Sequence, residues 1–339
     1  MGEKNAWNSS VSARLNEELQ RARELNTLYF PTTQKDLKAL QRRQAAGEVV
    51  EPRRNLFTLP GAWNDLSPQA RHLCILHGLQ AQHASWIFSN QSAAIAHGLP
   101  VAAWNLSDEH IAIGKHGTVA KRPHLIAHRT DPIHPTRTLG IRCTDATQTV
   151  LDCSRTLPFG EGLAITDAAL RYGLVSPSEL KCLLQTEGAH RTGIARARAV
   201  AQYADGRSES WGESQVRAQC IALGFALPDL QVEIDLPSEL GGTKRVDFLW
   251  ILPDGSYLIG EYDGMGKYQT REDIGNRGIR ALVEERQRES RLSILRAPIL
   301  RLTYPDVKDP LRFAQLLDAF GVPHARRANP TLVNDPLNM

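Results

Sequence analysis

The segment from residue 208 to residue 304 constrains the fold more than any other part of the chain, because its helix, strand and turn signals follow one another in a readable order. Gly224 closes a helical pattern, and Gly241-Gly242 and Pro253-Asp254-Gly255 mark turns. The predicted order is helix, strand, strand, strand, helix and strand over residues 209–223, 230–235, 245–251, 257–262, 279–291 and 294–302. We therefore expect a mixed α/β domain here.

Alternation of side chains along these strands brings acidic residues together. Asp247 lies near the start of the strand at 245–251, and Glu261 lies near the end of the strand at 257–262, on the same face as Asp263. In a hairpin we expect Asp247 and Glu261 to lie side by side. Carboxylates that meet at a sheet edge repel each other unless a cation joins them, and oxygen ligands of this kind suit Mg²⁺ or Mn²⁺.

Length and composition are those of a folded protein with more than one domain. The 339 residues and 37.6 kDa exceed the usual size of one domain, and 42% hydrophobic residues are enough for real cores. The net charge of +3 permits contact with nucleic acid without requiring it. The five cysteines are scattered and form no Cys-x-x-Cys pair, which argues against zinc and disulfides. A polar N-terminus and the lack of a long apolar run predict a cytoplasmic protein with no membrane contact.

The first 66 residues combine helical periodicity with a short basic hairpin. Apolar residues recur at helical spacing from Val11 to Leu25, and Thr33 begins a second helix. Strands predicted at 48–50 and 56–59 form a hairpin with a basic tip. A winged helix-turn-helix shows this pattern, because one helix enters the major groove and the wing touches phosphates. The candidate nucleic-acid-binding residues are Lys38, Arg42, Arg43, Arg53 and Arg54. The alternative is a small helical scaffold that binds no DNA.

The middle region and the end of the chain complete the predicted organisation. Strands are predicted at 110–113 and 125–128, between helical patterns. Asp205-Gly206-Arg207-Ser208 is typical of a linker, and the last residues, rich in Asn and Pro, are typical of a frayed end. The predicted parts are a winged helix-turn-helix domain at 1–66, an α+β middle domain at 67–205, an αβββαβ domain at 206–322 and a flexible tail at 323–339.

Three short motifs lie in the middle region: SNQSAAIAHGLP at 89–100, GIRCT at 140–144 and TVLD at 149–152. Together with the wing pattern they resemble the transcriptional-regulator-like antitoxins of the AbiE abortive-infection type. The resemblance covers roughly half of the chain. It implies an N-terminal winged helix, a mixed α/β domain behind it, binding to DNA and a cognate toxin as a partner protein.

The last domain carries a second resemblance. Its residues are Glu213 on the first helix, RVDFLW at 245–250, EYDG at 261–264 and Lys267-Tyr268. In this element order they resemble the PD-(D/E)xK nuclease superfamily, most closely its branch akin to very-short-patch-repair endonucleases. The resemblance implies a restriction-endonuclease-like core that hydrolyses phosphodiester bonds, with double-stranded DNA as the partner and Mg²⁺ or Mn²⁺ as the cofactor.

The same resemblance assigns roles to individual residues. The family's pattern places a lysine two residues after the second acid, where it offsets charge on the scissile phosphate, but this chain has Asp263 there. Lys267 is then the candidate for neutralising the phosphate, and Glu213 would hold a second cation or position the attacking water. The implied ligands of the first cation are Asp247, Glu261 and the backbone carbonyl of Tyr262, with Asp263 as an extension of the set.

Each candidate also has a structural interpretation. Glu213 and Arg217 are spaced to form an ion pair on an exposed helix, and residues 261–264 suit a strand end followed by a turn. Two functions from different classes follow from the motifs. One is a DNA-binding, magnesium-dependent endonuclease-like hydrolase, and the other is a DNA-binding antitoxin or transcriptional repressor with an inactive nuclease fold. A purely structural interaction protein is a third.

Overall fold

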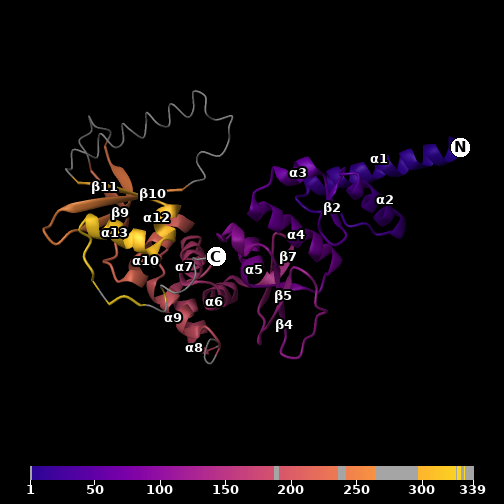
Figure 1. Ribbon diagram of the computed structural model, residues 1–339. Coiled ribbons are helices and arrows are strands. Elements are labelled where there is room, and N and C mark those ends of the chain that lie inside the picture. Colours follow the sequence, from indigo (N-terminus) through magenta and orange to yellow (C-terminus); the bar gives the residue numbers. More distant parts are fainter. Residues whose placement is uncertain are drawn as a thin grey trace, which may run out of the picture. The chain divides into compact units, whose positions relative to one another are not determined.

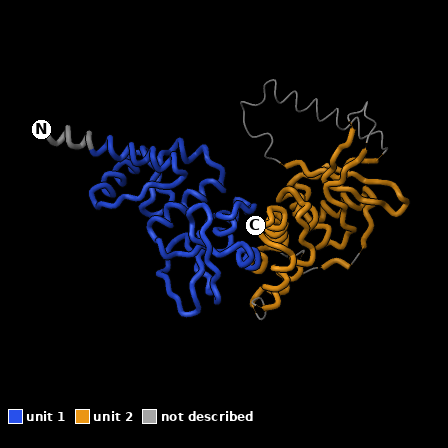
Figure 2. Tube along the Cα trace, turned by 180° about the vertical axis from the view of Figure 1, so that it is seen from behind, with its two compact units in different colours: residues 1–153 blue, residues 154–339 orange. Residues whose placement is uncertain are grey.

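The computed structural model describes residues 2–186, 191–235, 242–264, 297–325, 327–329 and 332. They form two compact units, unit 1 (Met1–Cys153) and unit 2 (Ser154–Met339), which Figure 2 shows in different colours. Each unit combines helices with β-sheet, so the chain is a mixed α/β protein (Figure 1). The predicted domain boundaries after residues 66 and 205 fall inside unit 1 and unit 2, respectively, and stay predictions. None of the described helices is long and apolar enough to cross a membrane.

Two helices begin unit 1. Helix α1 (Gly2–Glu24) buries the middle of the predicted apolar stripe, whereas Leu25 at the end of that stripe follows the helix and is 65% exposed. Helix α2 (Gln34–Ala45) is capped as predicted by Thr33, whose side chain accepts a hydrogen bond from the backbone N–H of Asp36 at 3.1 Å. The shared core of these helices and the following hairpin contains Leu15, Leu19, Leu40, Val49 and Phe57.

The hairpin of strands β1 (Val50–Arg53) and β2 (Leu56–Thr58) has a shorter turn than the sequence predicted. Arg53 was expected in the loop, but it belongs to β1 and pairs with the first residue of β2. The turn is therefore formed by Arg54 and Asn55. Asn55 has a φ of +61°, a left-handed conformation that asparagine adopts more readily than most residues.

A five-stranded sheet and its helices form the rest of unit 1. The elements are α3 (Pro60–Asn64), α4 (Pro68–Gln82), β3 (Ile87–Phe88), α5 (Asn90–Ala96), the short 3₁₀ helix η1 (Ala103–Asn105), β4 (Glu109–Ile113), β5 (Leu125–Arg129), β6 (Pro135–Thr138), β7 (Ile141–Thr144) and α6 (Ala146–Thr156), which crosses the division between the units. The strand order is β5-β4-β3-β7-β6. Strands β4 and β5 are parallel, as are β3 and β7, and the other neighbours are antiparallel.

The motif at 89–100 attaches α5 to this sheet. The hydroxyl of Ser92 accepts a hydrogen bond from the backbone N–H of His110 on β4 at 2.9 Å. The imidazole Nε2 of His97 donates to the backbone carbonyl of Thr144 on β7 at 2.8 Å. These bonds satisfy groups that packing removes from water, which explains the polar residues in an otherwise apolar motif.

Unit 2 combines helices with a four-stranded sheet (Figure 1). The elements are α7 (Phe159–Arg171), α8 (Pro177–Thr186), α9 (Ile194–Tyr203), α10 (Trp211–Leu223), β8 (Asp229–Ile234), β9 (Lys244–Ile251), β10 (Tyr257–Asp263), β11 (Ile299–Thr303), α12 (Tyr304–Lys308) and α13 (Pro310–Ala319). The strand order is β11-β10-β9-β8, with β11 parallel to β10 and the other pairs antiparallel. The helix predicted at 279–291 lies outside the described residues, and β11 begins at Ile299 rather than at residue 294.

Helix α10 packs closely against this sheet. Its Val216 and Cys220 share a buried core with Phe248 and Trp250 of β9. Near the start of the helix, a Cβ atom at Gly212 would lie 1.8 Å from the ring of Tyr262 on β10. Only glycine permits this approach, so the first turn of α10 lies directly over the end of β10.

The predicted flexible tail begins with residues that bond to the end of α10. His324 forms an antiparallel bridge with Phe225, and their rings stack at a centroid distance of 4.1 Å. The backbone N–H of Asn329 donates to the carbonyl of Ala222 at 2.9 Å. The first residues of the expected tail therefore belong to unit 2.

Buried charged groups join α10 to α7. Arg217 donates to the carboxylate of Asp167 at 2.6 Å, and the indole N–H of Trp211 donates to Glu161 at 3.0 Å. Burial raises the pKa of Asp167 to about 6, although the nearby charge of Arg217 opposes that shift. Burial raises the pKa of Glu161 to about 7, although the bond from Trp211 opposes it. Both carboxyl groups thus bind a proton more tightly in the folded chain than in the unfolded one.

We expect Glu161→Gln to stabilise unit 2 at pH 8 and to have little effect at pH 4.5. A folded-state pKa raised from 4.5 to about 7 means that stability is lost as pH rises through this window. Removing the charge should therefore raise the free energy of unfolding at pH 8 by on the order of 1–3 kcal/mol. Urea unfolding followed by circular dichroism at both pH values measures this. Glu233→Gln, on the exposed side of β8, is the control, and an equal gain at both pH values would contradict the assignment.

Candidate functional site

The sheet of unit 2 divides between β9 and β10. Their antiparallel pairing ends at Phe248 and Gly260. Beyond this point β9 continues beside β8, as far as Lys244, and β10 continues beside β11, as far as Asp263. This place, which we call the strand fork, is defined by Asp247 on β9 and by residues 261–263 on β10.

The carboxylate of Asp247 bridges the strand fork. Its Oδ2 accepts a hydrogen bond from the backbone N–H of Tyr262 at 3.0 Å. The register of the last pairs, Ile259 with Leu249 and Gly260 with Phe248, places Glu261 opposite Asp247 if it is continued by one residue. The structure thus places the carboxylate of Asp247 at the backbone of Tyr262, next to Glu261 in the chain, and the contact of the two carboxylates stays a prediction.

Glu261 has a basic neighbour on its other side. Parallel pairing places Arg301 of β11 beside Glu261 of β10, and Arg301 Nη2 lies 3.8 Å from Glu261 Oε2. Glu261 is 9% exposed, so this ion pair is partly shielded from water. Arg301 was missed in the sequence because only the register of the parallel strands identifies its neighbour. The available signal was its place in a basic stretch that ends there.

Glu213 lies at the start of α10 in a well-defined hydrogen-bond network. Its carboxylate accepts bonds from the backbone N–H of Glu209 at 2.8 Å, the hydroxyl of Ser210 at 2.8 Å and the amide of Gln231 at 2.9 Å. Burial raises the pKa of Glu213, these donors oppose the shift, and the charge of Asp247 raises the pKa further. The contact of the neighbouring Gly212 with the ring of Tyr262 places the start of α10 near the strand fork.

The alternative interpretation of Glu213 as the partner of Arg217 is wrong. Arg217 donates to Asp167 and to the backbone carbonyl of Tyr203 instead. Helical spacing alone suggested the pair, but Arg217 is only 5% exposed and the buried carboxylate of Asp167 competes successfully for it. Gln231, which orients Glu213, was also missed in the sequence.

The remaining residues predicted for this site are Asp263, Tyr262 and Lys267. Asp263 pairs with Thr303 of β11 and is partly buried at the end of β10. Burial raises the pKa of the Tyr262 phenol to about 12, and the charges of Tyr304 and Asp263 add to the shift. Lys267 lies outside the described residues.

A divalent cation at the strand fork would need several oxygen ligands. Among the described residues, no group of three or more His, Cys, Asp and Glu side chains is placed to hold a metal ion. The strand fork offers the two carboxylates of Asp247 and Glu261 and the backbone carbonyl of Tyr262. Mg²⁺ is often bound through one or two carboxylates while it keeps several waters, so this oxygen donor set fits Mg²⁺ by its chemistry.

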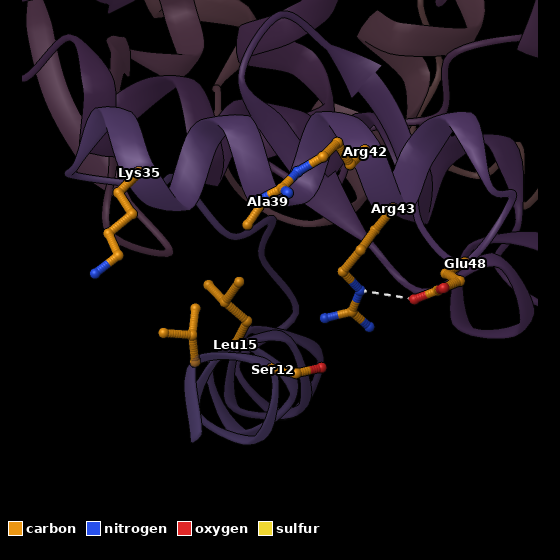
Figure 3. A pocket seen from close by; sticks show the side chains of 8 residues that line it. Ser12, Leu15, Lys35, Ala39, Arg42, Arg43 and Glu48 are labelled. Carbon is orange, nitrogen blue, oxygen red and sulfur yellow. Dashed lines mark hydrogen bonds and ion pairs between the residues drawn. The ribbon is translucent and has the colours of Figure 1, made fainter. Parts of the chain in front are cut away.

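The predicted nucleic-acid-binding residues of unit 1 fall into two groups. Arg43 donates to Glu48 at 3.0 Å and to Asn16 at 2.7 Å, beside a pocket of about 280 Å³ between α1 and α2. Figure 3 shows its guanidinium group directed at Glu48. Arg53 donates twice to the buried carboxylate of Glu109, at 2.9 and 3.0 Å. The exposed members are Lys38, Arg42 and Arg54, which form no ion pair with another described residue.

Comparison with known proteins finds relatives over part of the chain. No protein-family model matches it. The chain is 36% identical over 141 residues to Uncharacterized protein MT2308 of Mycobacterium tuberculosis (strain CDC 1551 / Oshkosh) and to Uncharacterized protein Rv2248 of Mycobacterium tuberculosis (strain ATCC 25618 / H37Rv). Each match covers 42% of this chain and 50% of the relative. The chain therefore spans about half the length of the curated relatives it matches.

Proposed function

We propose that this chain is a DNA-binding protein whose unit 2 hydrolyses phosphodiester bonds with the help of a divalent cation. The observation that carries the proposal is the strand fork, where the carboxylate of Asp247 bonds to the backbone N–H of Tyr262, next to Glu261 in the chain. Helix α10 with its Glu213, followed by β8, β9 and β10, agrees with the part of the expected nuclease element order that lies in the described residues. The resemblance of the sequence to that superfamily supports the same assignment.

The cation would be held by Asp247, Glu261 and the backbone carbonyl of Tyr262. When bound, Mg²⁺ or Mn²⁺ would polarise the phosphodiester and lower the pKa of a water molecule at the site. Glu213 orients that water, because its own carboxylate is held in place by Ser210 and Gln231. The raised pKa of Glu213 also makes it a better proton acceptor than an ordinary exposed glutamate.

Arg301 supplies positive charge at the strand fork. The family's pattern has a lysine where this chain has Asp263, so another cation has to offset the charge of the phosphate. Lys267 stays a candidate from the sequence. Arg301 is partly exposed, with 34% of its side chain accessible, and it lies beside Glu261. Its guanidinium group could therefore contact a phosphate while it remains near the acid.

DNA binding is assigned to unit 1. The exposed residues Lys38 and Arg42 lie on α2, and the exposed Arg54 lies in the turn of the hairpin. A helix and a wing that both contact phosphates would place positive charge at these positions. Arg43 and Arg53 have a different role, because their bonds to Glu48 and Glu109 hold the helices and the hairpin in place.

The second candidate function is a DNA-binding antitoxin or repressor whose nuclease-like unit is inactive. Two observations favour it: Asp263 stands where the family has lysine, and no described group of three acidic or histidine side chains is placed to hold a metal. In this case unit 2 would serve for association with a toxin protein. The cleavage experiment below separates the two functions.

We expect the pure protein to cleave supercoiled plasmid in the presence of Mg²⁺ or Mn²⁺. Asp247→Asn and Glu261→Gln should each lower the cleavage rate by about a hundredfold, the size of effect seen when one electrostatic group that stabilises a transition state is lost. These replacements keep the size of the side chain, and the amide oxygen introduced by Asp247→Asn could still accept the N–H bond from Tyr262. Asp229→Asn, on the exposed edge of the same sheet, should cleave normally.

Two results would overturn the catalytic proposal. One is cleavage that persists in both acid variants, which would indicate a contaminating nuclease. The other is the lack of cleavage of any DNA or RNA substrate by the unmodified protein, which would favour the antitoxin or repressor.

For Arg301→Ala we expect a fall in kcat of about tenfold or more without a higher Mg²⁺ requirement, because the removed cation contacts the phosphate and not the metal. Arg301→Lys should retain more activity, since it keeps the charge. Arg245→Ala is the matched control: Arg245 lies on β9, forms an ion pair with Glu209 and is 51% exposed. A change confined to the half-saturating Mg²⁺ concentration would mean that Arg301 only orients Glu261.

Replacing Lys38, Arg42 and Arg54 together by alanine should weaken binding to duplex DNA and flatten its salt dependence. Each lost phosphate contact reduces the slope of log K against log salt by about 0.9. Fluorescence anisotropy at several salt concentrations with EDTA measures the slope. A control with Lys181, Arg198 and Lys308 replaced removes the same charge from unit 2. If both triple variants change the slope equally, α2 and the hairpin turn are not the DNA-binding surface.

A further inference from the structure

Unit 1 contains a second pocket, of about 650 Å³, on the hairpin side of its sheet. Residues 51–55 of the hairpin line one part of the pocket. The rest includes Leu79, Gln82 and His83 at the end of α4 and residues 122–125, which lead into β5. This volume lies within the range of about 300–1,000 Å³ that is usual for small-molecule sites. It is too small to admit a DNA duplex.

The charges that line this pocket favour an anion. Arg53 is paired with Glu109, which is only 2% exposed. Arg54 is exposed in the turn, and Arg122 donates to the imidazole Nε2 of His83 at 2.7 Å instead of to a carboxylate. Burial, followed by the charge of Arg122, lowers the pKa of His83, so the imidazole is neutral and accepts this bond. Glu51 also lines the pocket and accepts a hydrogen bond from the backbone N–H of Asn55 at 2.6 Å. Arg54 and Arg122 outnumber this acid, so the pocket keeps positive charge that a ligand could use.

The flat groups in the pocket favour a ligand that contains an aromatic ring. His83 stacks on Trp86 with a centroid distance of 3.9 Å and an interplanar angle of 20°. The guanidinium carbon of Arg122 lies 5.4 Å from the centre of the Trp86 ring. Such aromatic and guanidinium planes are the groups on which proteins stack unpaired bases. Gln82 and Asn55 line the same pocket. The Gln82 amide donates one N–H to the backbone carbonyl of Arg54 at 3.4 Å, and each amide has a further donor and an acceptor that suit the edge of a base.

We propose that this pocket binds one nucleotide unit, with the base against the Trp86 and Arg122 planes and the phosphate near Arg54. The unit is either a free mononucleotide or one nucleotide of a single strand. This inference goes beyond the proposed function, which assigns duplex binding to α2 and the hairpin turn and gives no role to Trp86 or Arg122. It does not depend on cleavage by unit 2.

The test uses the full chain in EDTA, so that no cleavage takes place. Fluorescence anisotropy with a labelled single-stranded DNA of mixed sequence, and calorimetry with the purine and pyrimidine 5′-monophosphates, measure the two forms of the ligand. Arg122→Ala and Trp86→Leu should each weaken binding by about tenfold, because a stacked base is worth about 1–3 kcal/mol and about 1.4 kcal/mol corresponds to a factor of ten.

Lys121→Ala is the matched control, because Lys121 is exposed and adjacent to Arg122 but does not line the pocket. It should leave the affinity almost unchanged. Circular dichroism checks that Trp86→Leu and Arg122→Ala are folded, because Arg122 is exposed but also bonds to His83.

The outcomes are distinct. Binding of the single strand alone would identify a strand as the source of the nucleotide, and binding of a mononucleotide alone would identify a free ligand. The proposal is overturned if neither probe binds, or if Arg122→Ala weakens binding no more than Lys121→Ala does. Loss of plasmid cleavage with normal nucleotide binding would reject only the nuclease function.

Discussion

The separation of β9 from β10 is the constraint on which the candidate site depends. A backbone N–H that leaves the pairing of a sheet needs another acceptor, since a buried donor without one is costly. The carboxylate of Asp247 is the acceptor for the backbone N–H of Tyr262. The same bond holds the carboxylate of Asp247 at the backbone of Tyr262, so one side chain satisfies the backbone and supplies an acid of the proposed cation site. The carboxylate of Asp247 thus takes part in the hydrogen bonding of the sheet.

Helix α10 supports the strand fork by packing against β10. The contact of Gly212 with the ring of Tyr262 sets how closely the helix approaches β10, and the ion pair of Arg217 with Asp167 ties it to α7. Both contacts act on the first half of the helix, where Glu213 is held by its own hydrogen bonds. A buried ion pair contributes little net stability but is costly to break, which makes it suitable for fixing the position of a helix.

The distribution of positive charge gives unit 1 two different surfaces. Arg43 and Arg53 are held by acidic partners and support the helices and the hairpin, while exposed cations on α2 and in the hairpin turn are available to an extended polyanion. The pocket beside Trp86 includes Arg53 and Arg54 from both groups, but it differs from an open surface because flat side chains line it and its size suits one nucleotide. The sequence alone does not distinguish the arginines that have acidic partners from those that are exposed.

Local patterns in the sequence predicted α1, α2, α10 and most strands, and they placed Asp247 near the end of β10, because helical spacing, capping by Thr33 and alternation along a hairpin act between residues close in the chain. Only the tertiary structure decided that Arg301 lies beside Glu261 and that Arg217 pairs with Asp167. These partners are 40 and 50 positions apart. The parallel register of β10 and β11 brings Arg301 beside Glu261, and the packing of α10 against α7 brings Arg217 to Asp167. Neither leaves a periodic pattern in the sequence.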